Sequence, residues 1–210
     1  MEQYQIPASE TRLEIKVLNS RFISTIGPAF SIRDAREFIN RIKSEFKNAT
    51  HNVPAFIIGH GSTQVEHCSD DGEPFGTAGK PVLSILQGSG LGDVSIVVTR
   101  YFGGTKLGKG GLVRAYSDAT RSVLDILPRA IKIPSHTIQL ILPYNYFDKI
   151  QKIIEIYKGK IINQEFTTDV TITFVLDVNN YDNLASEIQV ITRDNYVIKI
   201  KDTKNEIIPV

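Results

Sequence analysis

The sequence has 210 residues, of which 41% are hydrophobic and 22% are charged, and its 24 lysines and arginines nearly balance 23 aspartates and glutamates. These proportions are typical of folded globular proteins and argue against a disordered chain, a collagen-like repeat or a small disulfide-rich protein. No apolar run approaches the roughly 20 residues that span a bilayer, the segment from Met1 to Glu10 lacks the features of a secretory signal, and the net charge of +1 excludes a global attraction to nucleic acid. We therefore expect a cytoplasmic protein.

The first half of the chain predicts helices that cover a mixed or antiparallel sheet, an α+β arrangement. Apolar and charged residues alternate from Arg12 to Val17, which predicts a strand with one buried face. Ser31, with Asp34 three residues later, predicts a helix start, and the apolar stripe that follows predicts a helix over 32–47. The remaining patterns predict, in order, a strand over 53–58, a long loop, a short helix after Pro81, a strand over 94–99 and a helix after Gly111.

Two prolines predict a domain boundary in the second half of the chain. Pro128 and Pro134 end a helical pattern and disfavour helix just before themselves, so we divide the chain into domains 1–133 and 134–210. The second domain is predicted to have the order βαββαβ, the ferredoxin-like arrangement. Its strands are expected over 138–142, 160–167, 170–176 and 196–201, with one helix that begins at an Asn145 N-cap and ends at Gly159 and another that follows Asn180.

Glycines and cations concentrate in one segment, from Val94 to Ser117, which contains no acidic residue. The predicted order there is strand, glycine-rich loop and helix. The first amide N–H groups of a helix have no intrahelical partner and carry partial positive charge, and glycine can add amides to form a concave site for phosphate or carboxylate oxygens. We expect an anion-binding site formed by Arg100, Gly103, Gly104, Lys106, Gly108, Lys109, Gly110, Gly111 and Arg114, extended by Arg21 and Lys80.

The alternative for this segment is a tight strand-to-helix connection whose lysines are simply solvated. Its glycine and lysine spacing is not that of a Walker A nucleotide loop, because the stretch from Gly104 to Lys109 is one residue short. Tyr101 and Phe102 could stack on exposed bases beside the cations, or they could be core rings.

Three carboxylates, Asp70, Asp71 and Glu73, lie within four residues. Their spacing does not match an EF-hand. We expect them to pair with Arg100, Arg114 or Lys80 and so to occupy the basic site until a phosphate displaces them. Plain solvation and a bound Mg²⁺ or Ca²⁺ are the alternatives.

Cys68 is the only cysteine, so no intrachain disulfide can form. Together with His60 and His67 it provides too few ligands for a structural zinc site. It could act as a nucleophile if His51 or His67 served as its base, or it could be a small buried side chain. We expect no metal, no cofactor and no catalytic residue.

Three blocks of the sequence carry a family resemblance. They are Ser20-Arg21-Phe22-Ile23, the segment from Ser69 to Pro81, and the segment from Val98 to Tyr116, which contains the glycine-rich loop. They resemble the IMPACT family, also called the YigZ family, in its bacterial two-domain branch. The resemblance implies an N-terminal fold akin to the second domain of a small-subunit ribosomal protein and a C-terminal fold like those of elongation factor G. It also implies a link to translation control, because eukaryotic members interfere with activation of an initiation-factor kinase by binding its activator, but it implies no reaction.

Together these observations predict a non-catalytic binding protein. Its expected partner is RNA, such as ribosomal or transfer RNA, or a ribosome-associated factor, held through the basic glycine-rich loop. One alternative is an enzyme that acts on a small phosphorylated metabolite or nucleotide at the same loop. The other is a protein-binding regulator whose loop recognises an acidic segment of a translation factor.

Overall fold

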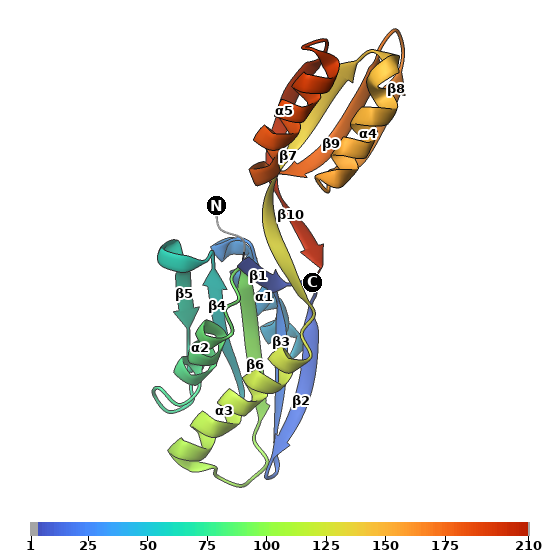
Figure 1. Ribbon diagram of the computed structural model, residues 1–210. Coiled ribbons are helices and arrows are strands. Elements are labelled where there is room, and N and C mark those ends of the chain that lie inside the picture. The colour runs from blue at the N-terminus through green and yellow to red at the C-terminus, as the bar shows by residue number, and fades with distance from the viewer. Residues whose placement is uncertain (1–3, 210) are drawn as a thin grey trace. The chain divides into compact units, whose positions relative to one another are not determined.

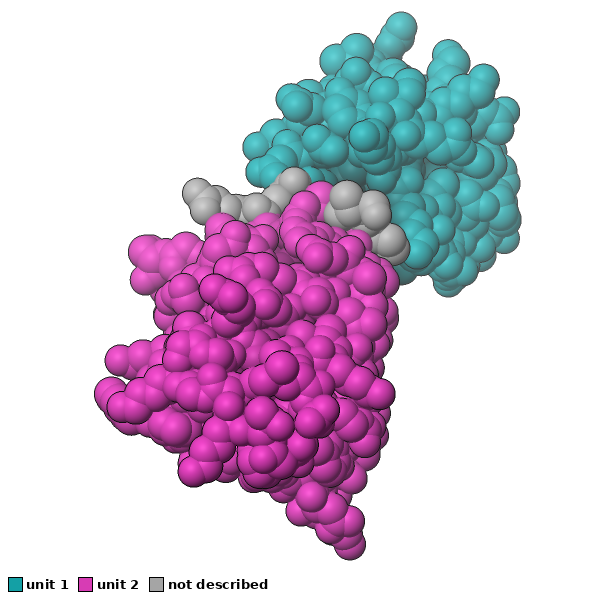
Figure 2. Space-filling view, turned by 90° about the horizontal axis from the view of Figure 1, so that it is seen from below, with its two compact units in different colours: residues 1–3, 132–206 teal, residues 4–131, 207–210 magenta. Residues whose placement is uncertain are grey.

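The computed structural model of the protein describes residues 4–209. The chain forms two compact units, which Figure 2 colours separately. Tyr4–Ile131, together with the chain end from Ile207, form the N-terminal unit, and Lys132–Glu206 form the C-terminal unit. The division lies inside one strand, β7 (Arg129–Leu142), so Pro134 sits within a strand and not in a linker. Proline is compatible with a strand position whose N–H does not take part in the ladder.

The N-terminal unit is a five-stranded antiparallel sheet with helices on both faces (Figure 1). Its strands are β2 (Thr11–Val17), β3 (Ser20–Pro28), β4 (His51–Ile58), β5 (Val65–Cys68) and β6 (Val94–Tyr101), and its helices are α1 (Ile32–Glu45), α2 (Gly79–Gly88) and α3 (Gly108–Asp125). The strand order is β2-β3-β6-β4-β5, which places β6 at the centre. A short strand, β1 (Tyr4–Pro7), pairs with β7.

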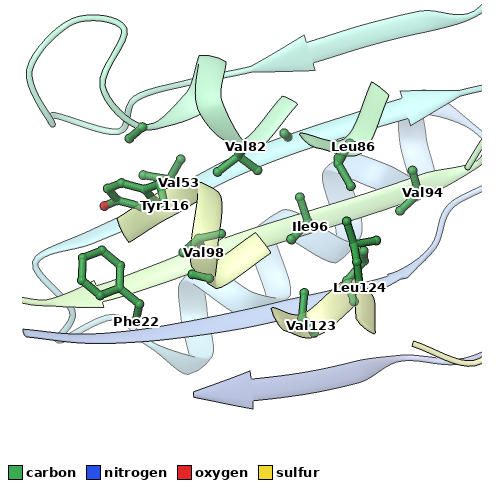
Figure 3. Packing of buried hydrophobic residues seen from close by; sticks show 14 of the residues in the cluster. Phe22, Val53, Val82, Leu86, Val94, Ile96, Val98, Tyr116, Val123 and Leu124 are labelled. Carbon is green, nitrogen blue, oxygen red and sulfur yellow. The ribbon is translucent and has the colours of Figure 1, made fainter. Parts of the chain in front are cut away.

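The central strand β6 contributes to both cores of this unit. Side chains alternate between the two faces of a strand. Val94, Ile96 and Val98 therefore pack with α2 and α3, as Figure 3 shows, whereas Val97 packs with α1. A strand that is buried on both faces carries apolar residues in succession, and this explains why the run from Val94 to Thr99 predicts a strand without alternation.

β3 is the longest strand of the N-terminal unit that the sequence patterns do not predict. Its polar residues Ser24 and Thr25 interrupt the apolar pattern, yet both are buried. The hydroxyl of Ser24 donates to the carbonyl oxygen of Ala119 at 2.9 Å, and the hydroxyl of Thr25 accepts from Arg12 Nε at 2.9 Å. Because hydrogen bonds from other elements satisfy these hydroxyls, the strand tolerates them inside the unit. β5 and a 3-10 turn over Gly61–Thr63 likewise lie within the predicted long loop.

The helix starts differ from prediction at three of five positions, and the helix over Tyr181–Thr192 begins directly after Asn180 as predicted. The Ser31 cap of α1 is confirmed, because the Ser31 hydroxyl accepts from the Asp34 amide at 3.1 Å. α2 begins at Gly79, before Pro81, since proline fits the first turn of a helix. α3 begins at Gly108 and not after Gly111. The predicted Asn145 cap is also wrong, because Asn145 lies in a 3-10 turn over Tyr144–Tyr146 that precedes the helix.

The C-terminal unit has the predicted order βαββαβ. After β7 come α4 (Phe147–Ile156), β8 (Lys160–Phe166), β9 (Val170–Asp177), α5 (Tyr181–Thr192) and β10 (Val197–Pro209). β7 lies between β9 and β10, and β8 pairs with the other edge of β9. Every second residue of β9 is buried against the two helices, as the alternation from Val170 predicts. α4 stops before Gly159, because Lys158 takes the left-handed conformation expected of the glycine.

Candidate functional site

A cavity of about 330 Å³ opens in the N-terminal unit beside the start of α3. The end of β6, the loop that follows it and the first turn of α3 form one side, and residues before and at the start of β4 form another. Its walls are mainly apolar, made by Pro74, Phe102, Leu107 and Leu112. Cavities with apolar walls and a few polar groups are typical ligand sites.

The cavity is bounded on one side by a buried ion pair between Arg100 and Glu73. Arg100 is 5% exposed and Glu73 is 7% exposed, and the guanidinium donates to Glu73 Oε1 at 2.7 Å. The hydroxyl of Tyr116 donates to the same oxygen at 2.8 Å. Burial, and then the charge of Glu73, raise the pKa of Tyr116 far above its usual value, so this hydroxyl keeps its proton and stays a donor.

Two polar groups at this ion pair leave room for a further hydrogen bond. Arg100 Nε is buried and has no hydrogen-bond partner among the described residues. The other carboxylate oxygen, Glu73 Oε2, lies 3.8 Å from His51 Nε2, which is beyond hydrogen-bond distance. A buried donor without a partner is costly, so these groups provide a reason for a ligand to bind here.

Neighbouring strands and rings hold Arg100 in place. It lies near the end of β6, paired with Phe22 on β3 and with His51 on β4. The guanidinium carbon lies 5.5 Å from the centre of the Phe22 ring and 5.6 Å from the centre of the Phe102 ring. Cation–π contacts of this kind stabilise a buried arginine. Figure 3 shows Phe22 and Tyr116 in the adjoining core.

Lys106, Gly108 and Lys109 form the rim of the cavity, and all three are exposed. The first turn of α3 holds no acidic residue. Within the described residues, no side chain accepts a hydrogen bond from the amides of that turn. The first turn of α3, which is the positive end of its helix dipole, and the side chains of Lys106 and Lys109 therefore lie beside the same opening.

α2 begins with an anion in the corresponding place. The carboxylate of Asp70 accepts from the amides of Gly76 at 2.7 Å, Gly79 at 2.8 Å and Ala78 at 3.1 Å. Burial alone would raise the pKa of Asp70, but these three hydrogen bonds outweigh it and hold the pKa below its usual value of 3.8. The carboxylate thus remains ionised at the first turn of α2.

The structure brings some of the predicted site residues to the cavity and leaves others elsewhere. Arg100, Lys106, Gly108 and Lys109 line it, and Gly110 and Gly111 belong to the first turns of α3. Three cations lie apart from it: Arg21 pairs with Glu14 on β2, Lys80 lies over the Phe75 ring, and Arg114 is exposed further along α3.

The glycines of the loop serve different purposes. Gly104 and Gly108 have positive φ angles of 83° and 71°, which glycine adopts readily. Gly103 has another reason to be glycine, because a Cβ there would lie 1.8 Å from the carbonyl oxygen of Asn19. Its amide donates to the Ser20 hydroxyl and not toward an external anion. Gly103 is therefore required for close packing of the loop against Asn19 and does not offer its amide to an anion.

The three predicted loop carboxylates have three different partners. Glu73 bonds to Arg100, whereas Asp70 bonds to backbone amides. Asp71 accepts from Lys43 Nζ at 2.6 Å and from the Asn52 amide at 2.7 Å. The structure agrees with the expected pairing for Glu73 only. The expectation is wrong for Asp70, which accepts from backbone amides, and for Asp71, whose cation is Lys43 on α1.

Cys68 lies on β5, paired with Ala55 on β4. Burial raises the pKa of its thiol, which makes it a poor nucleophile near neutral pH. His60 stacks on Tyr4, and His67 lies against Phe56. In residues 4–209, no three His, Cys, Asp or Glu side chains gather as a metal site, and no helix is long and apolar enough to cross a membrane.

Sequence reasoning missed several residues of the cavity. Thr50 lines it without any feature that marks it in the sequence, and Pro74, Leu107 and Leu112 lie in blocks of family resemblance that do not assign them to a site. Tyr116 is expected as an apolar helix position, and its hydrogen bond to Glu73 joins residues 43 positions apart. Phe102 is the exception, because the sequence already marks it as a ring beside the cations and directly before two glycines, and in the structure this ring is 46% exposed.

Comparison with known proteins places this chain beside bacterial relatives. The Impact N-terminal domain matches residues 18–124, and a domain of unknown function, DUF1949, matches residues 140–195. An IMPACT family member of Haemophilus influenzae is 36% identical over 95% of this chain and 98% of its own length. The IMPACT family member YigZ of Escherichia coli is 36% identical over 84% of this chain and 87% of its own. A crystal structure of a hypothetical protein matches with a TM-score of 0.65 and 32% identity, over 96% of this chain and 98% of that one.

Proposed function

This chain belongs to the IMPACT family, and we propose that it is a non-catalytic binding protein that holds RNA by its phosphates at the first turn of α3. The observation that carries the proposal is the contrast between two helix starts. At α2 the amides of the first turn bind the carboxylate of Asp70. At α3 the corresponding amides face Lys106 and Lys109 without an anion from the chain. An external phosphate would fill the role that Asp70 has at α2.

Two further observations support a nucleic acid as the source of that phosphate. Phe102 offers an exposed ring beside the lysines, and aromatic rings next to cations are typical of proteins that bind single strands. The link to translation control that the family resemblance implies agrees with a cytoplasmic RNA partner. Because the net charge is only +1, the attraction depends on this local patch and not on the whole protein.

A salt titration tests this function. We expect a fluorescently labelled single-stranded RNA to bind with an affinity that falls as salt rises. Changing Lys106 and Lys109 together to alanine should lower the slope of log affinity against log salt by about 1.4, since each neutralised phosphate contributes about 0.7 for a single strand.

The matched control is Lys149→Ala with Lys152→Ala on α4, which removes the same charge at the same spacing from the C-terminal unit. This control should keep the wild-type slope. Equal slopes for the wild type and the Lys106 and Lys109 double variant would refute the assigned site. Competition by an acidic peptide that matches competition by RNA would instead favour a protein partner.

A further inference from the structure

The cavity behind the α3 lysines differs from its rim in charge. The rim is cationic, whereas the buried boundary holds Arg100 and Glu73 with opposite charges. A phosphate pushed against that boundary would meet the Glu73 carboxylate, and like charges repel strongly where water is excluded. Phosphate therefore belongs at the rim, and the part of a ligand that enters the cavity must be uncharged.

The buried boundary nevertheless calls for hydrogen bonds. Arg100 Nε is a donor without a partner among the described residues, and Glu73 Oε2 is an acceptor that lies 3.8 Å from His51 Nε2, beyond hydrogen-bond distance. A neutral group that carries both an acceptor and a donor would satisfy the two together. The polar edge of every nucleobase offers that combination.

The walls provide apolar surface, against which the flat faces of such a ring can pack. Phe102 stands on one side with almost half of its surface exposed, and Pro74 and Leu112 provide further apolar surface. The volume of about 330 Å³ lies at the lower end of the range for small-molecule sites, about 300 to 1,000 Å³. A single nucleoside fits a volume of this size, whereas a base pair with its two sugars does not.

We propose that the cavity takes one unpaired nucleobase of the bound RNA, with its ring against Phe102 and its phosphate at the first turn of α3. The ring's polar edge meets Arg100 and Glu73, and the phosphate meets Lys106 and Lys109. This inference rests on the proposed function, because it names the part of the RNA that the site receives. It makes the site selective for single strands, since a paired base cannot leave its partner without a cost.

Calorimetric titration with adenosine 5′-monophosphate (AMP) and ribose 5-phosphate separates the two parts of the site. Both ligands carry the phosphate, but only AMP carries a base. We expect AMP to bind the wild-type protein at least tenfold more tightly than ribose 5-phosphate does. Phe102→Leu, which keeps an apolar side chain but removes the flat face, should weaken AMP about tenfold, the effect of losing one base–aromatic stack, and leave ribose 5-phosphate unchanged.

Phe75→Leu is the matched control. Phe75 is 89% exposed on the neighbouring loop and lies under Lys80 outside the cavity lining. This variant should bind both ligands as the wild type does. A duplex of the same length should compete with labelled single-stranded RNA at least tenfold less well than the unlabelled single strand.

The outcomes distinguish the inference from the function on which it rests. Equal affinity for AMP and ribose 5-phosphate, or AMP binding that Phe102→Leu does not change, overturns the base cavity even if RNA still binds through Lys106 and Lys109. Salt-dependent RNA binding that is insensitive to Phe102→Leu leaves the proposed function standing alone. If neither RNA nor AMP binds, both proposals fail.

Discussion

α2 and α3 both begin in segments that contain glycine and lysine, but the two helix starts differ in the charge that the chain places beside them. Before α2 the chain supplies its own anion, Asp70, which three amides hold in the ionised form. At α3 it supplies Lys106 and Lys109 and no acidic residue in the first turn. The amides at the start of α2 thus bind a carboxylate of the chain, whereas those at the start of α3 have no such partner among the described side chains. The comparison teaches that a glycine-rich helix start is available to an external anion only where the chain does not supply one itself.

The largest expected effect is on stability, at the start of α2, where the chain supplies its own anion. Asp70→Ala removes the acceptor of three amide hydrogen bonds and should lower the free energy of unfolding by about 2 kcal/mol, measured by urea denaturation. RNA affinity should stay within twofold of wild type, because Asp70 serves α2. Asp118→Ala is the control, since its ion pair with Arg121 is exposed and should contribute less than about 0.5 kcal/mol. A loss of RNA affinity without a loss of stability would reverse the roles assigned to the two helix starts.

Lowering the pH should reveal how much the Asp70 carboxylate contributes to the free energy of unfolding. The pKa of Asp70 is lower in the folded chain than its usual 3.8, so the folded state favours the ionised form. The stability that this group contributes is present above pH 3.8 and is lost as the pH falls through the lower folded value. In Asp70→Asn the free energy of unfolding should therefore fall less steeply with acid in this range. Parallel curves for the wild type and the variant would show that the amides do not discriminate between the two charge states.

At α3 we expect one substitution to have two smaller effects, a gain in stability and a loss of RNA affinity. Lys109→Glu places an anion in the first turn, as Asp70 does for α2, and should stabilise the protein by about 0.5 kcal/mol. The same change should weaken RNA binding about tenfold, because one phosphate contact becomes a repulsion. Thermal unfolding and anisotropy titration measure the two effects on one sample. Lys152→Glu on α4 should leave RNA affinity unchanged, and an equal loss there would assign the effect to net charge.

The smallest effect concerns two glycines of the open site. A Cβ at Gly110 would meet no atom within 4 Å, so Gly110→Ala should stabilise α3 by about 0.5 kcal/mol through helix propensity. Gly104 has a φ of +83°, so Gly104→Ala should cost about 1 kcal/mol although its Cβ is equally unobstructed. Urea denaturation measures both. Two changes of the same sign would mean that conformation does not decide where this loop needs glycine.

Local patterns predicted most of the fold. The alternation along β2 and β9 and the Ser31 cap of α1 are visible in a few neighbouring residues, and the structure has them as predicted. β3 was not predicted because its buried Ser24 interrupts the apolar pattern. The hydroxyl of Ser24 is satisfied by the carbonyl oxygen of Ala119, a residue 95 positions away. The cations of the site are likewise visible in the sequence, since Lys106 and Lys109 lie in one short segment.

By itself, then, the sequence determined the elements with a strong period, the family resemblance and the segment in which glycines and lysines meet. Only the tertiary structure decided which carboxylate goes to which donor: Asp71 to Lys43, Glu73 to Arg100 and Tyr116, and Asp70 to the start of α2. The physical reason is distance. Helix and strand periods arise between residues a few positions apart, whereas these bonds form between groups that only the packing of strands and helices brings within 3 Å or so of one another. The cavity beside Phe102 is a product of the same packing.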